Sequence, residues 1–217
     1  MKPSGIAGKL AFVTGASGGI GRAVVRQLLE EGASVVATDL DVSAIADLGC
    51  ETRALDVRDS AAVDTVIAEV ESSLGPVDYG VNVAGILSTT LVTETDDATW
   101  RNVFAVNTDG VFHVCRALAR VMQPRKRGAM VTVSSNAAGI PRHAMAAYAA
   151  SKAAATMFTR CLGIELAPHG IRCNIVAPGS TLTPMQTGMW ADENGAAKVI
   201  AGSLETFKAG IPLGKLA

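Results

Sequence analysis

Tyr148 and Lys152 are the residues of this chain whose types and spacing most clearly indicate chemistry. Within a helix, residues four positions apart lie on one face, so an ammonium group at Lys152 would lie beside the phenol of Tyr148. A free phenol has a pKa of about 10, and a nearby cation favours the phenolate and lowers that pKa. The pair predicts a proton-transfer group, although a surface tyrosine above a surface lysine has the same spacing.

Ser135 lies thirteen residues before Tyr148 and follows the apolar run 129–133, which predicts a buried strand. Its hydroxyl would lie at the carboxyl end of that strand, where open α/β sheets bind ligands. We therefore expect Ser135 to belong to the same site as the phenol.

A glycine-rich turn follows the first apolar segment. Residues 9–14 predict a strand, residues 14–21 read Thr-Gly-Ala-Ser-Gly-Gly-Ile-Gly, and residues 22–31 have helical periodicity. Glycines allow the backbone to approach a pyrophosphate closely, and the start of the helix offers free N–H groups to an anion. Any tight turn between a strand and a helix can need glycine, but this position near the N-terminus favours a nucleotide site.

Asp39 ends the second predicted strand, 24 residues after Gly15. A carboxylate at this place can accept hydrogen bonds from the hydroxyls of an adenosine ribose, and it would repel a 2′-phosphate. Ala16 and Ser17 occupy the turn where an arginine or lysine could neutralise such a phosphate. We therefore expect NAD rather than NADP as the cofactor; the alternative for Asp39 is an ordinary aspartate that caps a turn.

The bulk composition fits one domain over residues 1–217 with a formal net charge of −1 and a pI of about 6.3. This balance argues against nucleic acid or an anionic membrane as a partner. The N-terminus has no apolar signal segment, and no apolar run reaches the roughly 18 residues that span a bilayer. We expect a soluble, cytoplasmic protein. The cysteines and histidines show no metal-ligand spacing, so no metal site is expected.

Strand and helix patterns alternate up to about residue 176, which predicts an α/β fold with a doubly wound parallel sheet of the Rossmann type in three layers, α/β/α. The expected strands are 9–14, 34–39, 52–55, 77–81, 129–133 and 171–176, and the expected helices are 22–31, 61–74, 97–122 and 146–166. The glycine-containing polar segment 181–208 predicts a mobile flap over the site.

Over essentially its whole length the chain resembles the short-chain dehydrogenase/reductase family. The resemblance is carried by TGASGGIG at 14–21, Asp39, Asp56-Val57, NVAG at 82–85, Asn107, Ser135, YAASK at 148–152 and PGSTLT at 178–183. It implies an NAD-dependent oxidoreductase. Val83 stands where the family often has a second asparagine, a small departure that should not remove the cofactor.

The resemblance also implies a role for individual residues. Tyr148 would be the catalytic acid/base, Lys152 would lower its pKa and hold the nicotinamide ribose, and Ser135 would position the substrate oxygen. Asn107 would hold a water molecule in the proton relay. The implied cofactor-binding residues are Gly15, Ser17, Gly19, Ile20, Gly21, Asp39, Asp56, Val57, Asn82, Ala84, Tyr148, Lys152, Pro178, Gly179, Thr181 and Thr183.

A narrower resemblance is carried by the segments 84–87, 104–107, 141–142, 171–174, 178–181 and 210–215. In these segments the chain is similar to the branch of this family that oxidises 2,3-dihydro-2,3-dihydroxybenzoate to 2,3-dihydroxybenzoate on the way to catechol siderophores. Such a substrate, a cyclic dihydrodiol acid, carries a carboxylate that needs a cation. Arg142, six residues before Tyr148, could supply it, or could be an exposed loop arginine. From the flap, Gln186 and Met189 are expected to contact the substrate, and Trp190 could close over the ring or only pack within the flap.

The family normally continues past the last residues of this chain with one more helix and a seventh strand. Without them, strand 171–176 is expected to be an edge, which invites aggregation or instability, and assembly into the implied homotetramer or dimer becomes uncertain. Two other interpretations stay open. One is a different oxidoreductase of the family that acts on alcohols or ketones, such as a 3-oxoacyl carrier reductase. The other is a non-catalytic dinucleotide-binding protein.

Overall fold

Six parallel strands form one sheet in the order β3-β2-β1-β4-β5-β6 in the computed structural model, which describes residues 5–217. The strands are β1 Leu10–Thr14, β2 Ser34–Asp39, β3 Glu51–Ala54, β4 Val77–Asn82, β5 Gly128–Val133 and β6 Ile171–Val176. The strand order reverses direction between β1 and β4, which is the doubly wound arrangement and confirms the predicted fold class. Ligands of such sheets bind at that reversal, outside the carboxyl ends of the strands.

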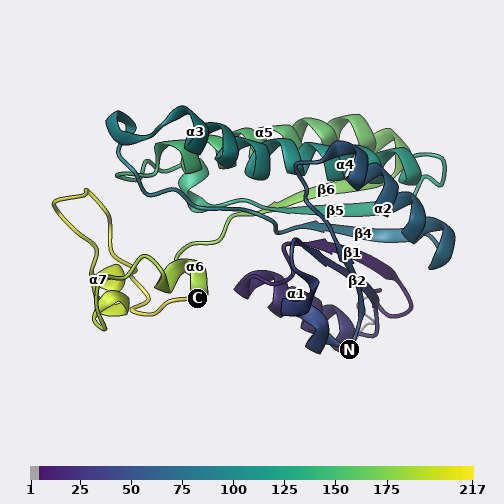
Figure 1. Ribbon diagram of the computed structural model, residues 1–217, viewed down its shortest axis with the longest axis horizontal. Helices are drawn as coiled ribbons and strands as arrows, with labels where there is room; N and C mark the ends of the chain where they lie inside the picture. The colour runs from purple at the N-terminus through teal and green to yellow at the C-terminus, as the bar shows by residue number, and fades with distance from the viewer. Residues whose placement is uncertain (1–4) are drawn as a thin grey trace.

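Helices cover the sheet on both faces and complete the three layers (Figure 1). They are α1 Gly19–Glu30, α2 Ser60–Ser73, α3 Asp97–Phe104, α4 Gly110–Met122 and α5 Ala146–Leu166, with a 3₁₀ segment η1 at Val42–Leu48. The bounds follow the predicted ranges closely. The largest difference is at α1, which begins inside the predicted glycine-rich turn because the N–H of Arg22 already donates to the carbonyl of Gly18 at 2.9 Å.

Two hydrophobic cores, one on each face, hold the sheet in place. Phe12, Leu118 and Met130 belong to the core beneath α2, α4 and α5, whereas Val13 and Ile45 belong to the core beneath α1 and η1. Phe12 and Val13 are neighbours in β1 and point to opposite faces, as the strand period of two requires. The strand ends that form the site are therefore anchored from both sides.

A π-helical turn η3, Ala105–Asp109, interrupts the helical stretch that was predicted as one helix over 97–122. It joins α3 to α4 without a break in the chain direction. Such turns widen the helix by one residue and often occur at functional sites. Asn107 lies in the middle of this turn, and its side chain is fully buried.

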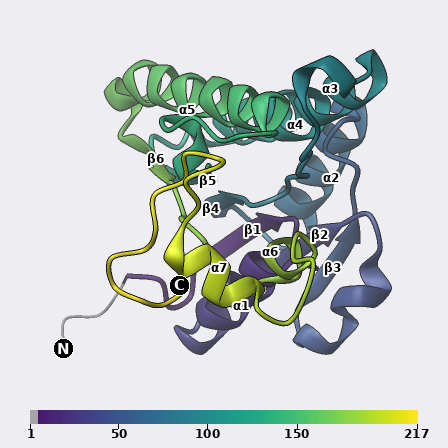
Figure 2. The same ribbon diagram turned by 90° about the vertical axis from the view of Figure 1, so that its left-hand side faces the viewer.

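The segment after β6 stands at one end of the sheet (Figure 2). It contains α6 Pro184–Thr187, α7 Gly195–Ala201 and a short antiparallel bridge between Ser203 and Lys208. Within residues 5–217, β6 forms one edge of the sheet, as predicted. No helix of the described chain is both long enough and apolar enough to cross a membrane.

Candidate active site

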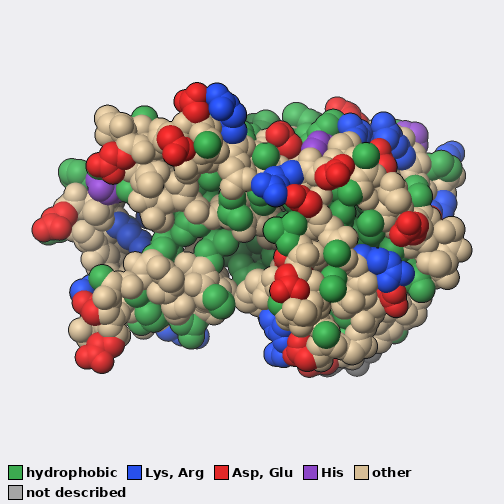
Figure 3. All heavy atoms as spheres, viewed as in Figure 1, with side chains coloured by type: hydrophobic (Ala, Val, Ile, Leu, Met, Phe, Trp, Pro, Cys, Tyr) green, Lys and Arg blue, Asp and Glu red, His purple; other side chains and the backbone are tan. Residues whose placement is uncertain are grey.

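A cleft of about 630 Å³ lies over the carboxyl ends of the strands. In the space-filling view the surface is hollowed between the helical layer and the segment after β6 (Figure 3). The cleft brings together most of the predicted site residues, namely Gly15, Ser17, Gly19, Ile20, Gly21, Asp39, Asp56, Val57, Ala84, Ser135, Arg142, Tyr148, Lys152, Pro178, Gly179, Thr181, Thr183, Gln186 and Met189. Two predicted residues, Asn82 and Asn107, do not line it.

The glycine-rich turn forms one end of the cleft. Gly15 has a φ of +68°, and a Cβ at this position would lie 2.5 Å from the backbone nitrogen of Ala84, so only glycine allows the first strand end to approach the fourth this closely. A Cβ at Gly19 would lie 2.8 Å from the Cγ2 atom of Thr183. The segment after β6 therefore touches the turn directly, and both border the same space.

Asp39 is held at the end of β2 by the same turn. Its Oδ2 atom accepts hydrogen bonds from the backbone N–H of Ser17 at 2.9 Å and from the Ser17 hydroxyl at 2.7 Å. The carboxylate lines the cleft next to the glycines. An anionic group is thus fixed where the predicted ribose would bind.

A short polar chain borders the cleft beyond β3. Arg58 donates to both carboxylate oxygens of Asp56, and it also donates to the Oδ1 atom of Asn102 at 2.9 Å. These hydrogen bonds from Arg58 hold the pKa of Asp56 below its usual range. Asp56 thereby stays ionised and fixed at the mouth of the cleft. Arg58 and Asn102, which also line it, were not predicted.

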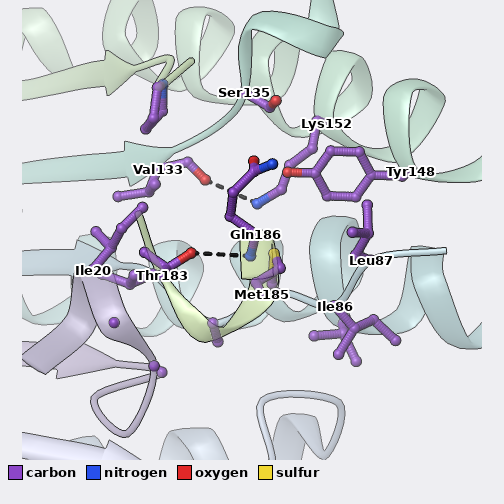
Figure 4. A pocket seen from close by; sticks show the side chains of 18 of the residues that line it. Ile20, Ile86, Leu87, Val133, Ser135, Tyr148, Lys152, Thr183, Met185 and Gln186 are labelled. Atoms are coloured by element: carbon purple, nitrogen blue, oxygen red, sulfur yellow. Dashed lines mark hydrogen bonds between the residues drawn. The ribbon is translucent and has the colours of Figure 1, made fainter. Parts of the chain in front are cut away.

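Tyr148, Lys152 and Ser135 meet at the centre of the cleft (Figure 4). Tyr148 and Lys152 lie one turn apart in α5, as predicted, and the Lys152 Nζ atom is 5.9 Å from the centroid of the Tyr148 ring. Lys152 is only 4 % exposed, and its ammonium donates to the carbonyl of Val133 at 2.9 Å. The end of β5 therefore fixes the lysine, and α5 fixes the tyrosine relative to it.

The pKa of Tyr148 is shifted in the direction opposite to our expectation. Burial raises the pKa of Tyr148, because a phenolate loses more hydration than a phenol, and the hydrogen bond to Ser135 lowers it only in part. The same burial lowers the pKa of Lys152 to about 8. The expected lowering of the Tyr148 pKa by Lys152 is therefore not seen in this structure. Ser135 is the group that favours the phenolate here.

Asn107 has a structural task in this arrangement. Its Oδ1 atom accepts from the N–H of Ile86 at 2.9 Å, while its Nδ2 atom donates to the carbonyl of Ile86 at 2.9 Å and to the Ser151 hydroxyl at 3.0 Å. The side chain of Asn107 is therefore not exposed in the cleft, and its expected role in holding a water molecule stays a prediction. The amide instead ties the loop after β4 to α5, next to Lys152.

Asn82 lies below the cleft rather than in its wall. It is 2 % exposed, and its Nδ2 atom donates to the Sγ atom of Cys115 at 3.2 Å. Asn82 therefore packs against α4 below the cleft, and its expected role in binding the cofactor stays a prediction. Val83, Ala84 and Gly85 are the residues of this strand end that face the cleft.

The predicted substrate residues belong to the wall of the same cleft. Arg142, Gln186 and Met189 all line it, and Gln186 projects from α6 toward the side where Tyr148 and Lys152 lie (Figure 4). Trp190 does not line it. Its ring packs against Gly195, where a Cβ would come within 2.1 Å, so Trp190 has the alternative role of packing within the flap.

Several lining residues were missed because their positions in the sequence carry no motif. They include Met145, Met185, Thr206 and Lys208. Only their position in the folded chain brings them to the cleft. Lys208 adds a positive charge near the predicted substrate end, and a search for unpaired cations in the flap could have found it.

The cleft fits a dinucleotide. The turn leaves room only for glycine at Gly15, and the fixed carboxylate of Asp39 and the buried ammonium of Lys152 supply ribose-binding groups in the same cleft. Pyrophosphates bind at such helix starts because the free N–H groups point at the anion. Ser17, Asp39 and Lys152 would hold the cofactor.

Comparison with known proteins agrees with this geometry. The family model described as short chain dehydrogenase matches residues 9–194. A 2,3-dihydro-2,3-dihydroxybenzoate dehydrogenase of Bacillus subtilis (strain 168) is 54% identical over 226 residues, which cover 100% of this chain and 87% of the relative. A 3-oxoacyl-[acyl-carrier-protein] reductase of Escherichia coli (strain K12) is 36% identical over 205 residues, which cover 91% of this chain and 84% of the relative.

The solved structures lead to the same result. The crystal structure of gox2181 matches with a TM-score of 0.81 and 34% sequence identity, covering 84% of this chain and 76% of that one. This protein therefore belongs to the short-chain dehydrogenase family and is an oxidoreductase that uses a nicotinamide dinucleotide.

Proposed function

We propose that this protein oxidises 2,3-dihydro-2,3-dihydroxybenzoate to 2,3-dihydroxybenzoate with NAD as the hydride acceptor. The observation that carries the proposal is that a proton-transfer group, Tyr148 with Lys152, shares one cleft with the cation Arg142. A carboxylated dihydrodiol needs both features at once. The Bacillus subtilis relative, at 54% identity over the full length of this chain, supports the same substrate.

The residues divide the chemistry between them. The hydroxyl of Ser135 donates to the substrate oxygen and holds it beside Tyr148, which removes the proton of that hydroxyl group. The dinucleotide, when bound, supplies the acceptor for the hydride that leaves the same carbon. While the Ser135 hydroxyl donates to the substrate instead of to Tyr148, the positive charge of Lys152 stabilises the phenolate that accepts the proton. The ketone that results tautomerises to a catechol, and aromatisation draws the oxidation forward.

The choice of NAD over NADP rests on Asp39. Its carboxylate lines the cleft and is fixed by two hydrogen bonds from Ser17. A ribose hydroxyl can donate to this carboxylate, whereas a 2′-phosphate would be repelled by it. Of the residues in the turn 14–21, none carries a positive charge that would offset the repulsion.

The cellular setting that we propose follows from the product. A 2,3-dihydroxybenzoate is a building unit of catechol siderophores, so the reaction belongs to their biosynthesis in the cytoplasm. We propose a homotetramer or a homodimer as the working form, which is what the resemblance to the family implies.

The proposal is tested by NAD reduction with a set of cyclic dihydrodiols, with and without a ring carboxylate. We expect the carboxylated diol to be oxidised with the highest kcat/KM. Turnover of a 3-oxoacyl thioester with NADPH in preference to any diol would assign the chain to the reductases. Saturable NAD binding without turnover of any substrate would assign it to the non-catalytic interpretation.

The companion variant is Tyr148→Phe. It removes the oxygen that accepts the proton and leaves the ring in place, so turnover should fall by about 10²–10⁴-fold, the range that positioned proton transfer supplies. Affinity for NAD, measured by titration calorimetry, should stay within about twofold. A variant with turnover close to wild type would refute the role of Tyr148 whatever the substrate is.

A further inference from the structure

Arg142 and Lys208 bring two positive charges to one cleft from segments 66 residues apart in the chain. Both side chains are half-buried. Among residues 5–217 neither forms a salt bridge, although eleven other cation–carboxylate pairs occur there. Both cations line the cleft, and neither has a carboxylate partner among the described residues.

The acidic residues of the cleft form hydrogen bonds with residues other than Arg142 and Lys208. In the described chain only Asp39 and Asp56 contribute carboxylates to its wall. Asp39 is bonded to Ser17 at the glycine-rich turn, and Asp56 is bonded to Arg58 beyond β3. Neither is a partner of Lys208 or Arg142, so an anion that neutralises this end has to come from a ligand.

The two cations affect each other. Burial lowers the pKa of Lys208, and the positive charge of Arg142 lowers it further. Two like charges that line one cleft repel each other, and a carboxylate bound between them would relieve both the repulsion and the loss of hydration. A charge-assisted hydrogen bond from each cation would then bind it.

The backbone beside each cation is held in an uncommon conformation. Ala144, two residues after Arg142, has a φ of 56°, and Phe207, which precedes Lys208, has a φ of 52°. A left-handed conformation at residues other than glycine costs free energy and tends to occur where the surrounding structure imposes it at functional sites. Two backbone hydrogen bonds between Ser203 and Lys208, of 2.8 and 2.9 Å, close the short loop that presents the lysine.

We propose that Lys208 is a second cation for the substrate carboxylate and that it binds this group together with Arg142. The inference rests on the proposed function, which it deepens by assigning a substrate-specificity residue to the flap. Because Lys208 ends the segment 181–208, a bound carboxylate ties the flap to the loop before α5. The charge of the substrate then decides whether the flap is held over the cleft.

Binding of two probes to the NAD-saturated protein tests the assignment by titration calorimetry. The probes are 2,3-dihydroxybenzoate and catechol, which differ by the carboxylate. We expect Lys208→Met to weaken binding of 2,3-dihydroxybenzoate by about ten- to hundredfold, the equivalent of one charge-assisted hydrogen bond. Catechol binding should change by less than about threefold, and Lys208→Arg should keep most of the preference for the acid.

Lys215→Met is the matched control, since Lys215 is exposed in the same C-terminal segment and does not line the cleft. It should bind both probes like the wild type. Equal weakening of both probes in Lys208→Met would overturn the inference, because the lysine would then only shape the flap. Unchanged binding of the acid would overturn it as well.

The inference and the proposed function can fail separately. Wild-type protein that oxidises the dihydrodiol acid but whose binding of 2,3-dihydroxybenzoate does not depend on Lys208 would refute only the inference. Protein that does not oxidise the dihydrodiol acid but prefers 2,3-dihydroxybenzoate over catechol through Lys208 would refute only the function. In the second case the two cations serve another carboxylated ligand.

Discussion

Lys152 is a buried cation that donates its hydrogen bond to a neutral carbonyl group. It is 4 % exposed and donates to the carbonyl of Val133, so the protein solvates its charge poorly. Burial therefore lowers the pKa of Lys152 from 10.5 to about 8. The folded state tolerates this charge at neutral pH, which costs stability, because a cation beside Tyr148 is what the proposed chemistry needs.

The pH dependence of stability should reveal this cost. Between pH 8 and pH 10.5 the unfolded chain keeps a proton on Lys152 that the folded protein has released, so the contribution of this residue to the free energy of unfolding rises with pH. The free energy of unfolding of Lys152→Met, relative to that of the wild type, should therefore be highest at pH 7. At pH 9.5 this difference in free energy of unfolding should be smaller by about 2 kcal/mol.

Urea unfolding of both proteins at the two pH values measures the change. Other groups that titrate in this range, such as the thiol of Cys115, are present in both proteins and cancel in the difference. Lys215→Met, which removes an exposed lysine, should show no such trend. A difference between Lys152→Met and wild type that stays constant with pH would show that Lys152 is well solvated.

At the scale of elements, the site depends on how closely the end of β1 approaches the end of β4. The Thr14 hydroxyl accepts from the backbone nitrogens of Val83 and Ala84 at 3.2 and 3.3 Å. Gly15 continues this approach, since a Cβ there would lie 2.5 Å from the nitrogen of Ala84. Gly15 and Ala84 both line the cleft, so this close approach shapes the wall of the site.

Comparison of two glycine variants isolates that close approach. Gly15 and Gly49 have nearly the same φ, +68° and +67°, but a Cβ at Gly49 would meet nothing within 4 Å. Gly49→Ala should therefore cost only the left-handed conformation, about 1–2 kcal/mol. Gly15→Ala should cost clearly more in free energy of unfolding, because backbone atoms must also move. If urea unfolding gave the same loss of free energy of unfolding for both variants, the backbone after β4 would have to move aside at no energetic cost.

At the scale of the whole molecule, the cleft is bordered by both halves of the sheet and by the flap. The lining residues come from the turn after β1, from the ends of β2 to β6 and from α5 and α6. A dinucleotide in this cleft would contact elements from both halves of the sheet at once. Binding should therefore stabilise the complete fold.

Thermal unfolding measures this effect. NAD at about one hundred times its dissociation constant should raise the free energy of unfolding by about 2.7 kcal/mol. For a chain of this size that corresponds to a rise in Tm of roughly 5–11 °C. NADP at the same concentration should give a smaller rise, and Asp39→Ala should narrow the gap. A larger rise with NADP in the wild type would contradict the role of Asp39.

Local patterns in the sequence were sufficient for most of the fold and for the centre of the site. The hydrophobic periodicity of residues 146–166 predicted α5 at its observed bounds, and the glycine-rich turn identified the first strand end. These features depend on neighbours within a few residues, for which helix geometry and turn conformation are decisive. For the same reason the spacing of Tyr148 and Lys152 correctly placed them one turn apart.

Burial and contacts between distant segments were decided only by the tertiary structure. The pKa of Tyr148 rises because packing excludes water from the phenol. The amide of Asn107 forms hydrogen bonds with Ile86, which lies 21 residues away in the chain. Lys208 reaches the cleft only because the flap folds back over the strand ends. No local pattern encodes these outcomes, since solvation and long-range pairing depend on the summed packing of the chain.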